Sequence, residues 1–290
     1  MDTRTKIIPK DEENGLMRDY GSNEDLSVEE ELDININIYD TFRLSLQFII
    51  LWFLANLVTN ASLSYTSVAS QTILSSTSSF FTLIIGYLVS VERINQNKIV
   101  GILLSFCGVL IVTKADTSDD NPNKNNSTII ILLGNLLALL GALIYGIYTI
   151  LLKFKISIKN SNVERNLNTH LFFGFVGLIC LILFWPVLIF LHYLDIEKFE
   201  LPPFKSTITL ILLINAAITF ISDFCWCNAV LLTSPLTVTV GLSMTIPLAM
   251  IGDWFIKGFD INLFYIFGAI IVTTGFLIIN KDEEEDFVED

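Results

Sequence analysis

Asp223 is the only charged side chain that lies well inside one of the long apolar stretches of the chain. The surrounding residues 207–231 are long and apolar enough to form a membrane-crossing helix. At about 1.5 Å per residue, the carboxyl group then lies roughly 6 Å from the middle of that helix. A carboxylate at this depth is costly unless it is protonated, paired or in contact with water. We expect Asp223 to carry a proton or bind a cation. The alternative is a protonated side chain hydrogen bonded to a neighbouring helix.

Further polar side chains recur at helical spacing along the same stretch. They are Asn215, Thr219, Asp223 and Cys227, with Trp226 beside them. Residues four apart lie on one face of an α-helix. This stripe predicts the lining of a path for a small molecule.

Two other apolar stretches are rich in hydroxyl groups. Residues 68–90 contain seven Ser and Thr side chains within eleven residues, including Ser75 and Ser79, which indicates one face toward a watery cavity. Residues 235–256 carry Ser243 and then Pro247. Because proline lacks a backbone donor and kinks a helix, we predict a gating bend at Pro247.

Amides and phenols in two more stretches extend this predicted lining, with interhelical hydrogen bonding as an equal alternative. They are Asn56, Asn60, Asn135, Tyr145 and Tyr148. No Arg or Lys lies at mid-membrane depth, so an anion would lack a counter-ion there. A carboxylate among aromatic rings suits a cation or a polar neutral compound better.

The remaining reactive side chains predict no enzyme, metal centre or cofactor. All four cysteines fall inside apolar stretches without the spacing of zinc ligands, so we interpret them as packing residues. No His, Cys or carboxylate cluster has catalytic spacing. Asp253, with Lys257 one turn later, predicts an ion pair at the membrane interface.

The elements that must position these side chains are membrane helices. The chain has 290 residues, is 52% hydrophobic and 16% charged, and has a mean hydropathy of +0.63. These values predict an all-α polytopic membrane bundle. Eight apolar stretches are each about long enough to cross a hydrocarbon core of roughly 30 Å. They cover residues 41–62, 68–90, 97–113, 127–152, 169–193, 207–231, 235–256 and 260–280.

The net charge of −13 belongs to the two ends of the chain. Residues 1–40 carry 12 acids and 4 bases, and residues 281–290 carry 7 acids and 1 base. We interpret both as disordered, solvated segments on the cytoplasmic side, because bases in short loops slightly favour that side. Without a basic face, nucleic acid is not an expected partner. Membrane lipid and a small solute are expected partners, and a homodimer stays open.

Small residues at helical spacing mark two packing faces, because they let backbones approach closely in lipid. One face carries Gly134, Ala138, Ala142 and Gly146, and the other carries Gly101, Ser105 and Gly108.

An internal repeat relates the two ends of the membrane region. Ser75 matches Ser243, Thr77 matches Thr245, Gly101 matches Gly268 and Gly108 matches Gly275. The copies are five stretches apart, so they cross the membrane in opposite directions, as in secondary transporters. We assign residues 41–280 to the transporter domain, with 41–114 a partial first repeat and 127–280 the second. The first repeat lacks two counterparts, so we expect a ten-helix architecture without its first two helices. An intact eight-helix bundle is the alternative.

Long runs within residues 39–282 resemble the drug/metabolite transporter superfamily. They are LWFLANLVTNASLSYTSVASQTILSSTSSFFTLIIG, GNLLALLGALIYGIY, and ITFISDFCW followed by LLTSPLTVTVGLSMTIPLAMIGDW. The runs look most like the F-type branch of solute carrier family 35 and its fungal vacuolar and thiamine-repressible members. The resemblance implies ten helices in two inverted sets of five and an endomembrane location, most specifically the vacuolar membrane.

Two functions from different classes remain. One is a secondary transporter of a small organic solute that works by alternating access, with proton coupling through Asp223. The other is a non-transporting membrane subunit or an inactive truncated transporter.

Overall fold

The computed structural model describes residues 36–116, 128–157, 165–195, 207–248, 251–252 and 263–289. Within these residues the regular elements are helices and there is no strand. The helices are α1 (Ile38–Leu63), α2 (Val68–Ser76), α3 (Ser78–Leu88), α4 (Gln96–Asp116), α5 (Thr128–Ile156), α6 (Thr169–Tyr193), α7 (Thr207–Leu232), α8 (Pro235–Gly241), the 3-10 helix η1 (Leu242–Met244) and α10 (Leu263–Glu289). The predicted all-α class is therefore confirmed over this part of the chain.

Six helical segments of the described residues are long and apolar enough to cross a membrane. They are Ile38–Leu63, Val68–Leu88, Gln96–Lys114, Ile129–Ile156, Thr169–Tyr193 and Thr207–Leu232. The predicted stretch at 235–256 contains a shorter apolar helix, Pro235–Leu248. The predicted ion pair of Asp253 and Lys257 lies outside the described residues.

The hydroxyl-rich stretch at 68–90 is interrupted rather than continuous. Thr77 separates α2 from α3. Around it, the Ser76 hydroxyl donates to Thr72 O at 2.8 Å and the Ser79 hydroxyl donates to Ser76 O at 2.9 Å. Such side-chain bonds compete with the helical ladder and bend it, which explains the break.

A second irregular turn precedes Pro247. The chain changes from α8 to the 3-10 helix η1 and then continues as a helical segment to Leu248. Proline at 247 cannot donate to residue 243 and its ring presses on that carbonyl, so the ladder is disturbed at η1.

The chain beyond residue 280 differs from the expected disordered tail. Helix α10 continues without a break to Glu289, and Asp282 is buried. The prediction of disorder is therefore wrong for residues 281–289. Side-chain contacts made by Asp282 and Glu283, described below, explain why the helix continues.

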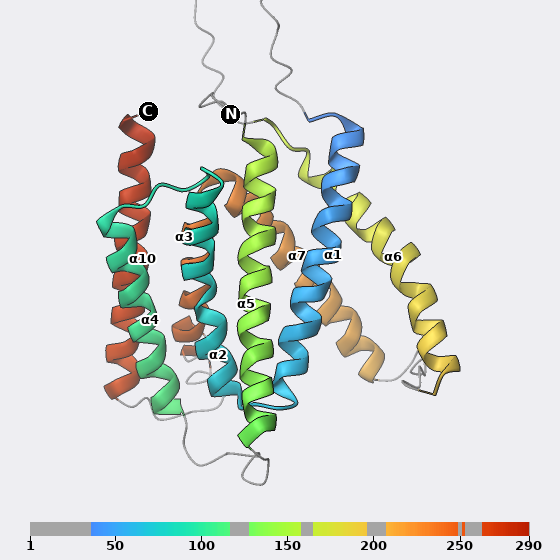
Figure 1. The fold of residues 1–290 in the computed structure, drawn as a ribbon, viewed down its shortest axis with the longest axis horizontal. Coiled ribbons are helices and arrows are strands. Elements are labelled where there is room, and N and C mark those ends of the chain that lie inside the picture. Colours follow the sequence, from blue (N-terminus) through green and yellow to red (C-terminus); the bar gives the residue numbers. More distant parts are fainter. Residues whose placement is uncertain are drawn as a thin grey trace, which may run out of the picture. The chain divides into compact units, whose positions relative to one another are not determined.

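The predicted small-residue faces lie at close helix contacts, as expected. Helices α4 and α10 lie side by side, and α5 lies beside α1 and α3 (Figure 1). A Cβ atom on Gly275 would lie 2.6 Å from Gly101 O, and one on Gly146 would lie 3.2 Å from Thr82 N. Only glycine permits the first of these approaches without movement of backbone atoms.

Candidate functional site

A cavity of about 480 Å³ lies among α1, α2, α3, α5, α7 and the segment from α8 to Ile246. Its wall is mainly polar and aromatic. Eight of the predicted path residues line it, namely Asn56, Ser75, Tyr145, Tyr148, Thr219, Asp223, Trp226 and Ser243. Five elements, α1, α2, α5, α7 and η1, thus bring these side chains together.

The other predicted path residues lie elsewhere. Asn60 and Asn215 are exposed on the outer surface of α1 and α7 and do not line the cavity. Asn135 of α5 accepts a hydrogen bond at 2.6 Å from the hydroxyl of Thr66, in the connection between α1 and α2, so it has a packing role instead. Ser79 is buried at the start of α3, and its hydroxyl donates to Ser76 O at the end of α2. Pro247 is buried next to the lining residue Ile246.

Asp223 is half-buried in the cavity wall. Among the residues that the structure describes, none donates a hydrogen bond or forms an ion pair with its carboxylate. Within the described lining it is also the only ionisable side chain besides the two tyrosines. A carboxylate in this position is available to a proton or to a cationic group.

The aromatic side of the cavity is held rigidly. The Trp226 indole N–H donates to the Tyr145 hydroxyl at 2.9 Å. The Tyr148 ring lies edge-on to Trp226 at 5.5 Å and to Tyr145 at 5.1 Å, and Phe48 supports it from α1 at 5.4 Å. Edge-to-face contacts of this kind stabilise a fixed arrangement of rings.

Sequence analysis did not predict several of the residues that line the cavity, among them Trp52 and Gln71. Trp52 lies one turn before Asn56, whose side-chain amide donates to the Trp52 carbonyl at 2.8 Å. The four-residue spacing of Trp52 and Asn56 is the signal that could have identified Trp52.

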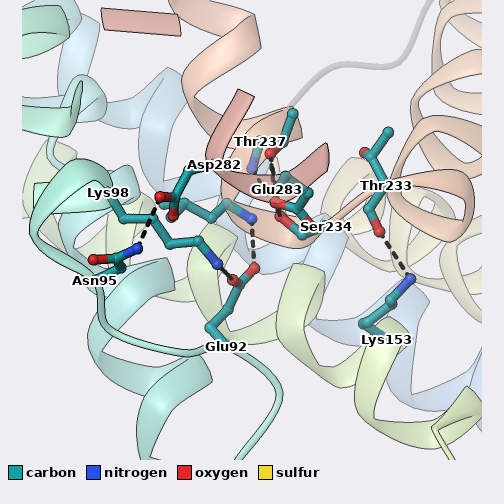
Figure 2. Close-up of polar contacts among 10 residues, drawn as sticks. Glu92, Asn95, Lys98, Lys153, Thr233, Ser234, Thr237, Asp282 and Glu283 are labelled. Carbon is teal, nitrogen blue, oxygen red and sulfur yellow. Dashed lines mark hydrogen bonds and ion pairs between the residues drawn. The ribbon is translucent and has the colours of Figure 1, made fainter. Parts of the chain in front are cut away.

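A second polar cluster, the Glu92 network, lies where the loop after α3 meets α8 and α10 (Figure 2). It consists of Glu92, Asn95, Asn97, Lys98, Ser234, the Leu236 amide, Thr237, Asp282 and Glu283. Sequence analysis missed it, because its members lie in short connections and at helix ends, where polar residues are ordinary.

Glu92 is a buried acid of this network, with a side chain that is 2% exposed. Its Oε1 atom accepts the Leu236 amide at 3.0 Å, and its Oε2 atom lies 3.4 Å from Lys98 Nζ. Burial raises the pKa of the Glu92 carboxyl above its usual value, and the Glu283 carboxylate adds to this. Lys98 and the Leu236 amide act in the opposite direction.

The remaining acids of the network accept hydrogen bonds from the facing elements, although Asp282 Oδ2 is buried and has no hydrogen-bond partner among the described residues. Glu283 Oε2 accepts the hydroxyls of Ser234 at 2.6 Å and Thr237 at 2.8 Å. Asp282 Oδ1 accepts the side-chain amides of Asn95 and Asn97, each at 2.8 Å.

Six long apolar helices among the described residues, four of which contribute to the wall of the cavity, define a multi-pass membrane protein. Within the described residues no group of three or more His, Cys, Asp or Glu side chains could hold a metal ion. Comparison with known proteins agrees with a multi-pass membrane protein. Residues 33–114 match the EamA-like transporter family.

Three relatives extend the match over most of the chain. An uncharacterized vacuolar membrane protein of Saccharomyces cerevisiae is 49% identical over 88% of this chain and 65% of its own length. An uncharacterized transporter of Schizosaccharomyces pombe is 45% identical over 84% of this chain and 70% of its own length. Solute carrier family 35 member F5 of Bos taurus is 36% identical over 81% of this chain and 43% of its own length.

The chain therefore belongs to the EamA-like transporter family, and the resemblance drawn from its sequence is confirmed. It spans about two thirds of the length of the first yeast relative and less than half of the bovine solute carrier.

Proposed function

We propose that the protein is a secondary transporter of a small organic solute that works by alternating access in the vacuolar membrane. The observation that carries this proposal is the cavity itself, where an unpaired carboxylate, amides, hydroxyls and aromatic rings meet between apolar helices. Polar groups are expensive at membrane depth and usually mark a substrate or ion path. The vacuolar location is proposed because the S. cerevisiae relative is a vacuolar membrane protein.

Matching helix breaks support the proposed inverted repeat of residues 41–114 and 127–280. The break at Thr77 and the end of η1 at Thr245 fall at positions that the repeat pairs. Interrupted helices at corresponding positions of two inverted halves are typical of transporter binding sites. Ser75 and Ser243, also paired by the repeat, both line the cavity.

Glycine packing between α4 and α10 supports the same repeat. Gly101 lies against Gly275, and Gly108 lies against Gly268. The repeat pairs Gly101 with Gly268 and Gly108 with Gly275, so each contact has a counterpart with the copies exchanged. Such reciprocity is expected of two like elements related by a two-fold axis.

The cavity wall favours a solute that donates hydrogen bonds. The hydroxyls of Thr72, Ser76 and Thr219 already donate to carbonyls of their own helices, which leaves oxygen lone pairs as acceptors. Asp223 adds a carboxylate, and no Lys or Arg occurs among the described lining residues. A small organic cation, or a neutral compound rich in N–H and O–H groups, fits this wall.

Proton coupling is assigned to Asp223, because it is the one carboxylate in the described cavity wall. Asp223→Asn keeps the size of the side chain and removes its titration. We expect the variant to lose at least about tenfold of pH-driven uptake into proteoliposomes, the loss that one charge-assisted contact provides. A mixture of labelled organic cations and sugars serves as the solute screen.

Asn215→Ala is the matched control for this experiment. It changes a polar residue two turns away on the same helix that lies outside the cavity, so uptake should stay near wild type. If Asp223→Asn takes up the solute at the same rate as the wild type at every pH, the coupling role is refuted.

A non-transporting membrane subunit is the second candidate. It is favoured by α6 and α7, because only 6% and 0% of the residues in their most apolar stretches are buried. Such faces could pack against a second copy or another chain instead of lipid. Purified protein that shows no uptake but forms a stable complex in mild detergent would favour this candidate.

A further inference from the structure

Helix α8 connects the Glu92 network to the cavity. Ser234 and Thr237 belong to the network, whereas Thr239, Ser243 and Ile246 on the same helical segment line the cavity. From Thr237 to Ser243 the distance along the segment is about 9 Å at 1.5 Å per residue. A movement of the start of α8 is therefore transmitted directly to the cavity wall.

The bonds of the network join the two proposed repeats. Glu92, Asn95, Asn97 and Lys98 come from the first repeat, and Ser234, Leu236, Thr237, Asp282 and Glu283 come from the second or its continuation. Glu92 supplies the cap for the buried Leu236 amide, a donor in the first turn of α8 that has no partner within the helix.

An apolar layer packs beside the network, and its residues come from the same part of the fold, namely α3, α4, α8 and α10. Leu83 of α3 and Ile102 of α4 pack with Leu236 and Val240 of α8 and Ile279 of α10, and all five are buried. No residue of the Glu92 network is among the cavity lining. On α8 the network and this apolar layer occupy residues 234–240, next to the cavity-lining Thr239.

The local fold places Glu92 firmly. The amides of Val91 and Glu92 both donate to Gly86 O, at 2.8 and 3.1 Å. A Cβ atom on Gly86 would lie 2.6 Å from Glu92 Cγ, so the glycine makes room for the acid. A buried acid held by a turn, a lysine and a helix cap is specific for one arrangement of α3 and α8.

We propose that the Glu92 network is a closed gate between the cavity and the end of the bundle where α10 terminates, and that Glu92 holds it shut across the two repeats. This inference rests on the proposed transport cycle. To open the cavity at this end, the loop after α3 must separate from the start of α8 and from α10, which breaks the bond from Leu236 N to Glu92 and the bond from Asn95 to Asp282. The raised pKa of Glu92 agrees with a carboxyl that is dry in the closed state.

The test measures thiol labelling in a Ser243→Cys background, because Ser243 lines the cavity. Membrane vesicles carrying the full chain are captured by a tag placed after Asp290, so that the Glu92 end faces the bulk solution. A membrane-impermeant methanethiosulfonate is added outside, and labelling at position 243 is followed by mass spectrometry. Glu92→Gln should speed labelling at least about tenfold, since one charge-assisted hydrogen bond is weakened. Asn95→Ala, at an exposed loop position, should give a smaller increase.

Asp40→Asn is the matched control. It neutralises a carboxyl that lies in the same pocket as Lys155, at the C-terminal end of α5, and Asp40 is not part of the Glu92 network. Its labelling rate should equal that of the unmodified background. Equal rates in all variants, or an equal increase in Asp40→Asn, would overturn the gate. If Glu92→Gln fails to fold, the labelling rate of Asn95→Ala relative to the background decides whether the gate exists.

The gate and the transport function fail in different ways. Absent uptake with the expected labelling pattern removes the transport function and keeps the gate. Normal uptake together with a labelling rate at position 243 that is the same in Glu92→Gln, Asn95→Ala and the background would refute the gate but not the transport function.

Discussion

The two acids of greatest interest differ in what surrounds them. Asp223 is half-buried beside a cavity and has no partner among the described residues. Glu92 is fully buried and has a lysine and a backbone amide as partners. A free carboxylate can exchange a proton or a cation during a cycle, whereas a satisfied one stabilises a single arrangement. We therefore assign coupling to Asp223 and gating to Glu92.

The stability contributed by Glu92 should depend on pH in a definite direction. Its pKa is raised from 4.5 in the folded protein, so the folded state binds the proton more tightly than the unfolded state. The contribution is then fully present below 4.5 and is lost as pH rises through the folded pKa. The melting temperature of the wild type relative to Glu92→Gln should fall across that range. A difference that is constant or rises with pH would contradict the prediction.

At the scale of elements, glycine contacts and side-chain hydrogen bonds set the local geometry. Hydroxyl groups break the stretch at 68–90 around Thr77, and Pro247 produces the 3-10 turn at η1. The small-residue faces were predicted from spacing alone, and the structure shows them at the contacts of α4 with α10 and of α5 with α1 and α3. The break at Thr77 was not predicted, because hydropathy reports the total length of a span and not its continuity.

Gly275→Ala should destabilise the α4–α10 contact. The added Cβ would lie 2.6 Å from Gly101 O and 2.7 Å from Ser105 N, so the two backbones must separate. We expect a loss of about 1–3 kcal/mol, as for overpacked interiors, visible as a lower melting temperature in detergent.

Gly174→Ala is the control for this substitution, because nothing lies within 4 Å of its added Cβ. The helix propensity of alanine should make it neutral or stabilising by up to about 1 kcal/mol. Equal losses in both variants would show that the glycine contact does not hold α4 against α10.

At the scale of the whole molecule, the proposed inverted repeat sets the direction of each helix. Gly101 packs on Gly275 and Gly108 on Gly268, so α4 and α10 run in opposite directions (Figure 1). The loop before α4 and its counterpart near residue 258 should then lie on opposite sides of the membrane.

Labelling from each side of sealed vesicles checks this arrangement. Arg93→Cys should react only with reagent on the Glu92 side, and Gly258→Cys, which lies outside the described residues, only with reagent on the other side. Reaction of both positions from one side would exclude the inverted repeat and with it the alternating-access mechanism.

By itself, the sequence determined the membrane class, the family, the polar stripe with Asp223 and the glycine faces, because hydropathy, repeat and helical spacing are local properties of the chain. Only the tertiary structure decided which polar residues face the cavity. Asn60 and Asn215 lie one turn from the lining residues Asn56 and Thr219, on the same helix faces, but outside the cavity, because the neighbouring elements decide how far along a helix the cavity extends. Tertiary contacts also assembled the Glu92 network, in which residues 92–98 meet residues more than 100 positions later, at 234–237 and 282–283, and no local pattern connects them.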